Sequence, residues 1–120
     1  MKIVVTASKP SLDSPVDARF GRAPYFIAVD TETGEWEAHD NKQNLNAAQG
    51  AGIQAAETVS RLGAEAVITG HCGPKAYRTL TAAGIGIAVG AEGTVAEAVE
   101  AYKNGKLTPA DSPDVEGHWA

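Results

Sequence analysis

Residues 50–90 read GAGIQAAETVSRLGAEAVITGHCGPKAYRTLTAAGIGIAVG and contain a repeated pattern from which the architecture can be derived. Gly63 follows Gly52 by 11 residues, and Gly84 follows Gly73 by the same 11 residues. Each glycine pair brackets a segment of helical period and is followed by a short apolar run that ends in glycine. Helices that alternate with buried strands predict parallel strands joined by right-handed crossovers. This part of the chain therefore predicts an α/β fold.

The flanking sequence extends this pattern into one domain. A β-branched run at 2–7 and a hairpin with Gly34 in its turn precede the repeat, and a helix with Thr94 as its N-cap follows it. The order βββαβαβα predicts a three-layer fold with a mixed five-stranded sheet flanked by helices. The predicted strands are 2–7, 25–30, 35–40, 65–70 and 85–90, and the predicted helices are 47–62, 73–84 and 94–105. Residues 1–106 form the predicted domain, and residues 107–120 form a mobile C-terminal tail.

Composition narrows the possible functions. The chain has 120 residues, a net charge of −5 and one cysteine. Nucleic acid and anionic membranes need clustered Lys and Arg, so neither is an expected partner. A single cysteine cannot form an internal disulfide, which favours a reducing compartment. With no secretory signal pattern and no apolar run of membrane-spanning length, we expect a cytoplasmic protein.

In open α/β sheets, ligands bind beyond the carboxyl ends of the parallel strands. Three glycine-rich turns precede helices at that end, and their free N–H groups and helix dipoles favour an anion. Arg19 and Arg22 lie in the segment after the first strand and could add positive charge. Glycines also simply mark tight turns, so each turn taken alone is weak support. Together they predict an anion site.

The lone cysteine is adjacent to a histidine, His71–Cys72, just before the second helix. A zinc or iron–sulfur site needs about four Cys or His ligands, and only His39 and His118 remain. Adjacent residues also seldom orient each other as nucleophile and base. Two interpretations stay open. The thiol fills space in the core, or it is a thiolate, stabilised by the helix dipole, that contacts a soft metal in a preassembled ligand.

Three segments together resemble the dinitrogenase iron–molybdenum cofactor biosynthesis family. They are DARFGRAPYFIAVD (17–30), the repeat quoted above and the closing GHW (117–119), and the likeness runs from about Lys2 to Ala101. The resemblance implies a ribonuclease-H-like fold and a small protein that carries or helps to assemble metal–sulfur cofactors. The implied ligand is a preformed anionic cluster held noncovalently, either a molybdenum–copper sulfide cluster or an iron–molybdenum or iron–sulfur cluster. A protein partner for cluster delivery is a further expectation.

The resemblance also implies which loops bind the cluster, by position in this chain. His71 and Cys72 are the predicted metal contacts. The full predicted set is Arg19, Gly21, Arg22, Gly50, Gly52, His71, Cys72, Gly73, Gly93 and Thr94.

Two other classes of function remain as alternatives. One is a protein-interaction module without a metal. The other is a small hydrolase or nuclease, but the nearby carboxylates Asp13, Asp17 and Glu92 are scattered on loops rather than clustered for magnesium. The sequence therefore favours a carrier that is not an enzyme.

Overall fold

The computed structural model of the chain describes residues 1–41 and 50–110. It contains one mixed sheet of six strands in the order β3-β2-β1-β4-β5-β6. Strands β1, β4 and β5 are parallel, and β2, β3 and β6 are antiparallel to their neighbours. The strands are β1 (Lys2–Ala7), β2 (Tyr25–Asp30), β3 (Trp36–Asp40), β4 (Ala66–Ile68), β5 (Gly86–Val89) and β6 (Thr108–Pro109); the helices are α2 (Ala51–Arg61), α3 (Pro74–Ala82) and α4 (Val95–Lys103).

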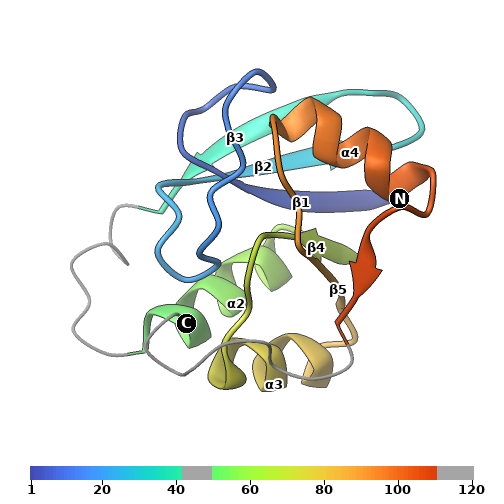
Figure 1. Ribbon diagram of the computed structural model, residues 1–120. Helices are drawn as coiled ribbons and strands as arrows, with labels where there is room; N and C mark the ends of the chain where they lie inside the picture. The colour runs from blue at the N-terminus through green and yellow to red at the C-terminus, as the bar shows by residue number, and fades with distance from the viewer. Residues whose placement is uncertain (42–49, 111–120) are drawn as a thin grey trace.

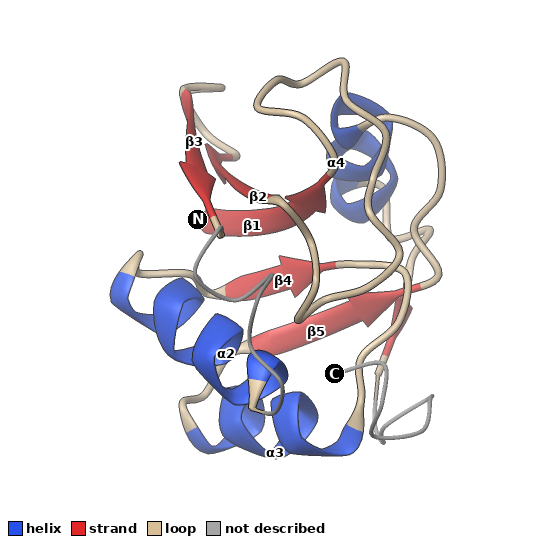
Figure 2. Ribbon diagram, turned by 90° about the vertical axis from the view of Figure 1, so that its left-hand side faces the viewer, coloured by secondary structure: helices blue, strands red, loops and turns tan. Residues whose placement is uncertain are grey.

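The helices form two layers, one on each face of the sheet. Helices α2 and α3 pack together on one face and α4 lies on the other (Figure 1, Figure 2). The central strand β1 is buried between them, and its side chains alternate between two apolar clusters. Val4 packs with Val59 and Leu80 under α2 and α3. Ile3 and Val5 pack with the α4 side chains. The predicted three-layer architecture is confirmed.

The predicted helix ends are also confirmed. Gly63 and Gly84 have φ values of 81° and 75° just after α2 and α3, a conformation that glycine adopts without strain. Thr94 caps α4, because its side chain accepts a hydrogen bond from the backbone N–H of Glu97. The turn residue Gly34 of the β2–β3 hairpin has a φ of 80°.

The number of strands differs from the prediction, because the sheet has one more strand near the end of the described residues. The sequence predicted five strands and a tail from residue 107, but Thr108 and Pro109 form the short sixth strand, paired antiparallel with β5. The Ala110 N–H continues this pairing by donating to the Ile87 carbonyl over 2.8 Å. A two-residue strand is too short to show a hydrophobic period in the sequence. It forms here because β5 has an edge with which it can pair. Residues 111–120, with the predicted mobile tail, and 42–49, with the predicted start of the first helix, lie outside the described residues.

Residues 8–24, which we call the crossing loop, connect β1 to β2 across the carboxyl end of the sheet (Figure 1). The loop first contacts the start of α4, where the Val16 N–H donates to the Gly93 carbonyl over 2.9 Å. It next contacts the turn after β4, where the His71 N–H donates to the Ala18 carbonyl over 2.7 Å. The crossing loop therefore joins both faces of the molecule at this end.

Two buried hydroxyls hold the middle of the crossing loop. Thr6 and Thr69 are fully buried at the ends of the parallel strands β1 and β4. The Thr6 hydroxyl donates to the Asp17 carbonyl over 2.7 Å and lies 2.9 Å from the Thr69 hydroxyl. Buried polar groups are costly unless they are paired, so these threonines fix the position of residue 17.

A buried leucine on α3 provides a test of the core beneath α2 and α3. Leu80 is fully buried, so Leu80→Ala should lower the free energy of unfolding by about 3 kcal/mol. Leu62→Ala is the matched control, because the same change at a half-buried position should cost about 1 kcal/mol. Urea unfolding followed by circular dichroism measures both values. Equal costs would contradict the described packing.

A glycine contact provides a test of the crossing loop. A Cβ on Gly70 would lie 2.7 Å from Ala18 Cα and 2.9 Å from its carbonyl oxygen. Because both are backbone atoms, Gly70→Ala should displace the loop and cost about 2 kcal/mol in urea unfolding. Gly86→Ala is the control, since a Cβ there meets nothing closer than 3.8 Å, and its effect should stay within about 0.5 kcal/mol. An unchanged Gly70→Ala stability would mean that loop and turn are not in contact.

Candidate functional site

The candidate site lies at the carboxyl end of the parallel strands. Each of these strands ends there and leads into a turn, and the three helices begin at the same end (Figure 2). The crossing loop covers this end from the β1 side. The structure thus places the predicted site segments at one end of the sheet. They do not all contact one another there.

Arg19 and His71 lie side by side. They form a parallel bridge between the crossing loop and the turn after β4. Asp17 Oδ1 accepts from the Arg19 N–H over 2.9 Å and lies 3.5 Å from Arg19 Nε, so one carboxylate fixes both the turn and the guanidinium. The Arg19 side chain remains 50% exposed. His71 is half-buried. Arg19 and His71 therefore occupy adjacent backbone positions at the surface.

The residues that follow Arg19 in the crossing loop are held in place by buried side chains. Phe20 is fully buried, and its ring centroid lies 6.0 Å from that of Phe26 on β2. The buried Asn41 side chain donates to the Ala23 carbonyl over 2.9 Å and to the Gly21 carbonyl over 3.3 Å. Arg22, between these two acceptors, is half-buried. The aromatic anchor and the amide fix the segment in which both arginines lie.

Helices α2 and α3 begin without a side-chain cap. Within the described ranges, neither N-cap residue, Gly50 or Gly73, makes a side-chain cap bond, and neither first turn contains an acidic residue. Gly52 and Gly73 are both buried. Helix N-termini without a carboxylate favour a bound anion, because the helix dipole is positive there.

Helix α4 differs, because protein atoms already satisfy its first N–H groups. The Glu97 side chain accepts from the Thr94 N–H over 2.9 Å, completing a capping box with Thr94. The Val95 and Ala96 N–H groups donate to the carbonyls of Ser14 and Leu12 over 2.9 and 3.0 Å. Gly93 is packed against the same glutamate, since a Cβ there would lie 2.7 Å from Glu97 Oε1. The predicted residues Gly93 and Thr94 therefore belong to a closed helix start.

Cys72 is buried in the apolar core, just before α3. The residue is 1% exposed and belongs to the apolar cluster beneath α2 and α3. Its Sγ atom is 3.8 Å from the Gly73 carbonyl oxygen. The described ranges contain no group of three or more His, Cys, Asp and Glu residues that could hold a metal ion. His39 lies on β3, 3.3 Å from Glu37, and His118 lies outside the described residues.

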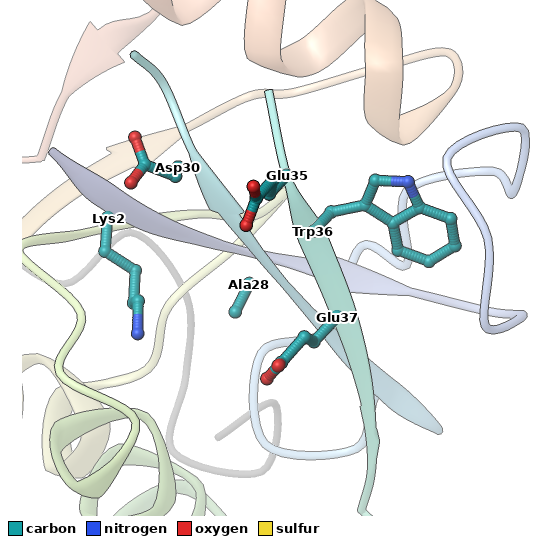
Figure 3. A pocket seen from close by; sticks show the side chains of 6 residues that line it. All are labelled: Lys2, Ala28, Asp30, Glu35, Trp36 and Glu37. Atoms are coloured by element: carbon teal, nitrogen blue, oxygen red, sulfur yellow. The ribbon is translucent and has the colours of Figure 1, made fainter. Parts of the chain in front are cut away.

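A hollow elsewhere has the opposite electrostatic character. It has a volume of about 270 Å³ and is lined by side chains of β1, β2, β3 and the turn before β3, at the end where β1 begins (Figure 3). Three of them are carboxylates, with one lysine, and backbone hydrogen bonds from Glu32 and Thr33 lower the pKa of the Asp30 carboxyl. The lining residues are Lys2, Ala28, Asp30, Glu35, Trp36 and Glu37. A hollow of this charge does not suit an anion.

Several residues that build the site were not predicted. Gly70 permits the close approach of Ala18, Asn41 holds the arginine segment, and the Thr6–Thr69 pair fixes residue 17. The role of Gly70 could have been predicted, because glycine at the end of a strand often marks a position where another backbone segment approaches closely. The roles of the other three depend on contacts between segments distant in sequence.

Comparison with known proteins agrees with this architecture. The chain is similar to the orange protein of Desulfovibrio gigas, whose apo form has been solved. The two are 42% identical, with a TM-score of 0.93 over 95% of this chain and 96% of that one. A Thermotoga protein of the DUF35 family is 34% identical, with a TM-score of 0.83 over 97% of this chain and 98% of that one. An uncharacterized protein of Methanocaldococcus jannaschii is 28% identical over 82% of this chain and 85% of its own length.

The family profile described as "Dinitrogenase iron-molybdenum cofactor" matches residues 1–105, which include the crossing loop, both uncapped helix starts and His71. Within the described ranges, no helix is long and apolar enough to cross a membrane. The profile and the fold together show that this chain belongs to the dinitrogenase iron–molybdenum cofactor family.

Proposed function

We propose that the chain binds and carries an anionic metal–sulfur cluster noncovalently, in the site between the crossing loop and the starts of α2 and α3. Membership of the family supports a role in binding or carrying a metal cofactor. The D. gigas neighbour is named an orange protein and was solved in its apo form, which suggests a coloured state with a ligand bound.

One structural contrast carries the proposal. Of the three helix starts at this end of the sheet, α4 has its own glutamate cap, whereas α2 and α3 have no side-chain cap among the described residues. Arg19 lies beside His71, two residues before the N-cap of α3, and Arg22 lies in the same crossing loop, between the two carbonyls that Asn41 holds. Two positive dipole ends and two guanidinium groups in one region favour a multiply charged anion over a neutral ligand.

The ligand set favours capture of a preformed cluster. His71 is half-buried and is the imidazole beside Arg19, so it is the candidate for direct contact with metal or sulfide. Cys72 is buried in the apolar cluster, and we infer that its thiol supports the turn by packing. Assembly of a cluster on the protein would need more Cys or His ligands than this site supplies.

The proposed cargo is a molybdenum–copper sulfide cluster, with an iron–molybdenum or iron–sulfur cluster as the alternative. Thiomolybdate-type clusters are anionic and sulfur-rich, so backbone N–H donors and arginines can bind them without a covalent bond. In this proposal the chain is a carrier rather than an enzyme, and it passes the cluster to a protein partner.

Titration with tetrathiomolybdate and copper(I) tests the proposal. A charge-transfer band should co-elute with the protein in gel filtration, and Arg19→Ala should weaken binding about tenfold by removing a charge-assisted contact. Arg61→Ala is the matched control, because it removes the same charge at the last turn of α2, far from the site. Equal loss in both variants would indicate nonspecific attraction, and absence of any retained band would exclude this cluster.

The role of Cys72 gives a second prediction. Cys72→Ala should retain the charge-transfer band, because the thiol is buried, and should lower the free energy of unfolding by about 1 kcal/mol. Absorption spectra of the loaded variant and urea unfolding of the apo variant measure the two effects. Loss of the band in a variant with an unchanged circular dichroism spectrum would instead identify Cys72 as a ligand.

A further inference from the structure

A groove lies on the face of the sheet that α4 covers, opposite α2 and α3 (Figure 1, Figure 2). It has a volume of about 180 Å³ and lies between α4, the crossing loop, the end of β2 and the β2–β3 turn. Its apolar lining comes from Leu12, Val29, Ala96 and Val99. A shallow hollow of about 370 Å³ adjoins the groove, shares Ala96 and Glu100 with it, and continues along the outer side of α4. Two depressions that share residues therefore follow the length of one helix.

An exposed tryptophan extends the apolar lining of the groove. Trp36 is 40% exposed, and its partner across the sheet is Val29, which lines the groove. Residues directly opposite each other in a sheet point to the same face, and Val29 packs with the α4 side chains. In Figure 3 the indole accordingly points away from Glu37, which lines the acidic hollow on the other face. The groove and the indole thus form one apolar surface.

The rim of this surface is acidic. Asp30 on β2 and Glu100 on α4 both lie at the groove. The lysine at the same rim, Lys103, lies 3.6 Å from Glu100, so its charge is already paired with a carboxylate. The backbone N–H groups of Glu32 and Thr33 donate to Asp30, which lowers the pKa of its carboxyl and keeps it charged at neutral pH. Negative charge therefore exceeds positive charge around the groove.

The occupant that suits this surface combines apolar and basic side chains, which match the apolar lining and the carboxylate rim. A helix fits the shape, because the two depressions follow α4 and its half-buried Ala96 and Ala101 are short enough for a second helix to approach closely. A second copy of this chain is unfavourable, since a two-fold contact would bring the two acidic rims face to face. The same rim repels nucleic acid and anionic membranes.

We propose that the groove beside α4, together with Trp36, is the docking surface for a basic amphipathic helix of a partner protein. The apolar side of that helix covers the indole and the groove, and its lysine or arginine side chains face Asp30 and Glu100. The surface lies on the opposite face of the sheet from α2 and α3, and none of its residues belongs to the proposed cluster site. The inference therefore stands independently of the proposed function.

A labelled synthetic helix of leucine and lysine is the probe, titrated with the full chain and followed by fluorescence anisotropy. We expect saturable binding that Glu100→Lys weakens about tenfold, because the new cation repels the lysines of the probe. Glu57→Lys is the matched control, since it makes the same change at an exposed position of α2, on the other face, and should leave the affinity unchanged. Absence of saturable binding, or equal weakening in both variants, overturns the proposal.

Two further measurements separate apolar contact from charge. Trp36→Ala should weaken binding of the same probe about tenfold, because it removes the exposed indole, while the circular dichroism spectrum of the free chain stays unchanged. A helix of leucine and glutamate should not bind, because its carboxylates face the acidic rim. Full affinity in Trp36→Ala, or binding of the glutamate helix, would contradict the proposed surface.

A charge reversal on the other face of the sheet tests the location. Glu37 lines the acidic hollow and points away from the groove, so Glu37→Lys should leave the affinity for the leucine–lysine helix unchanged. A loss in this variant that equals or exceeds the loss in Glu100→Lys would place the probe in the acidic hollow instead and would overturn the proposal.

Discussion

The candidate site depends on the close approach of two backbone segments, the crossing loop at Ala18 and the turn after β4 at Gly70. A Cβ on Gly70 would lie 2.7 Å from Ala18 Cα, so only glycine leaves room for this approach. The same contact aligns the His71 N–H with the Ala18 carbonyl and brings Arg19 beside His71. The buried pair Thr6–Thr69 supports it from the sheet. Without this approach, the arginine and the imidazole would belong to unconnected loops.

The three helix starts differ in whether an acidic side chain caps the first turn. Helix α4 uses Glu97 and two carbonyls of the crossing loop to satisfy its own first turn. Helices α2 and α3 have no acidic residue in the first turn. Lys75 lies in the first turn of α3, and Arg19 is bridged to His71 just before that helix. This difference places a favourable region for an anion on the α2–α3 side of the sheet, although the chain as a whole carries a net charge of −5.

Much of the fold could be predicted from the sequence, because the relevant signals are local. The β-branched run of β1 and the glycines after α2 and α3 each determine structure within a few residues. The site was less predictable. Thr94 was correctly predicted as a cap, but its capping box and the crossing-loop carbonyls close the helix start that was expected to bind the ligand. The burial of Cys72 and the support from Asn41 depend on tertiary contacts that no local pattern encodes.

The most direct test of the central claim is NMR mapping of backbone amide shifts during titration of the apo-protein with the molybdenum–copper sulfide cluster. We predict that the largest shifts fall on residues 18–22 and 71–76 and at the start of α2. The amides of residues 93–97 should change little, because protein acceptors already satisfy that helix start. Largest shifts at residues 93–97, or around the acidic hollow beside β3, would contradict the proposed location of the site.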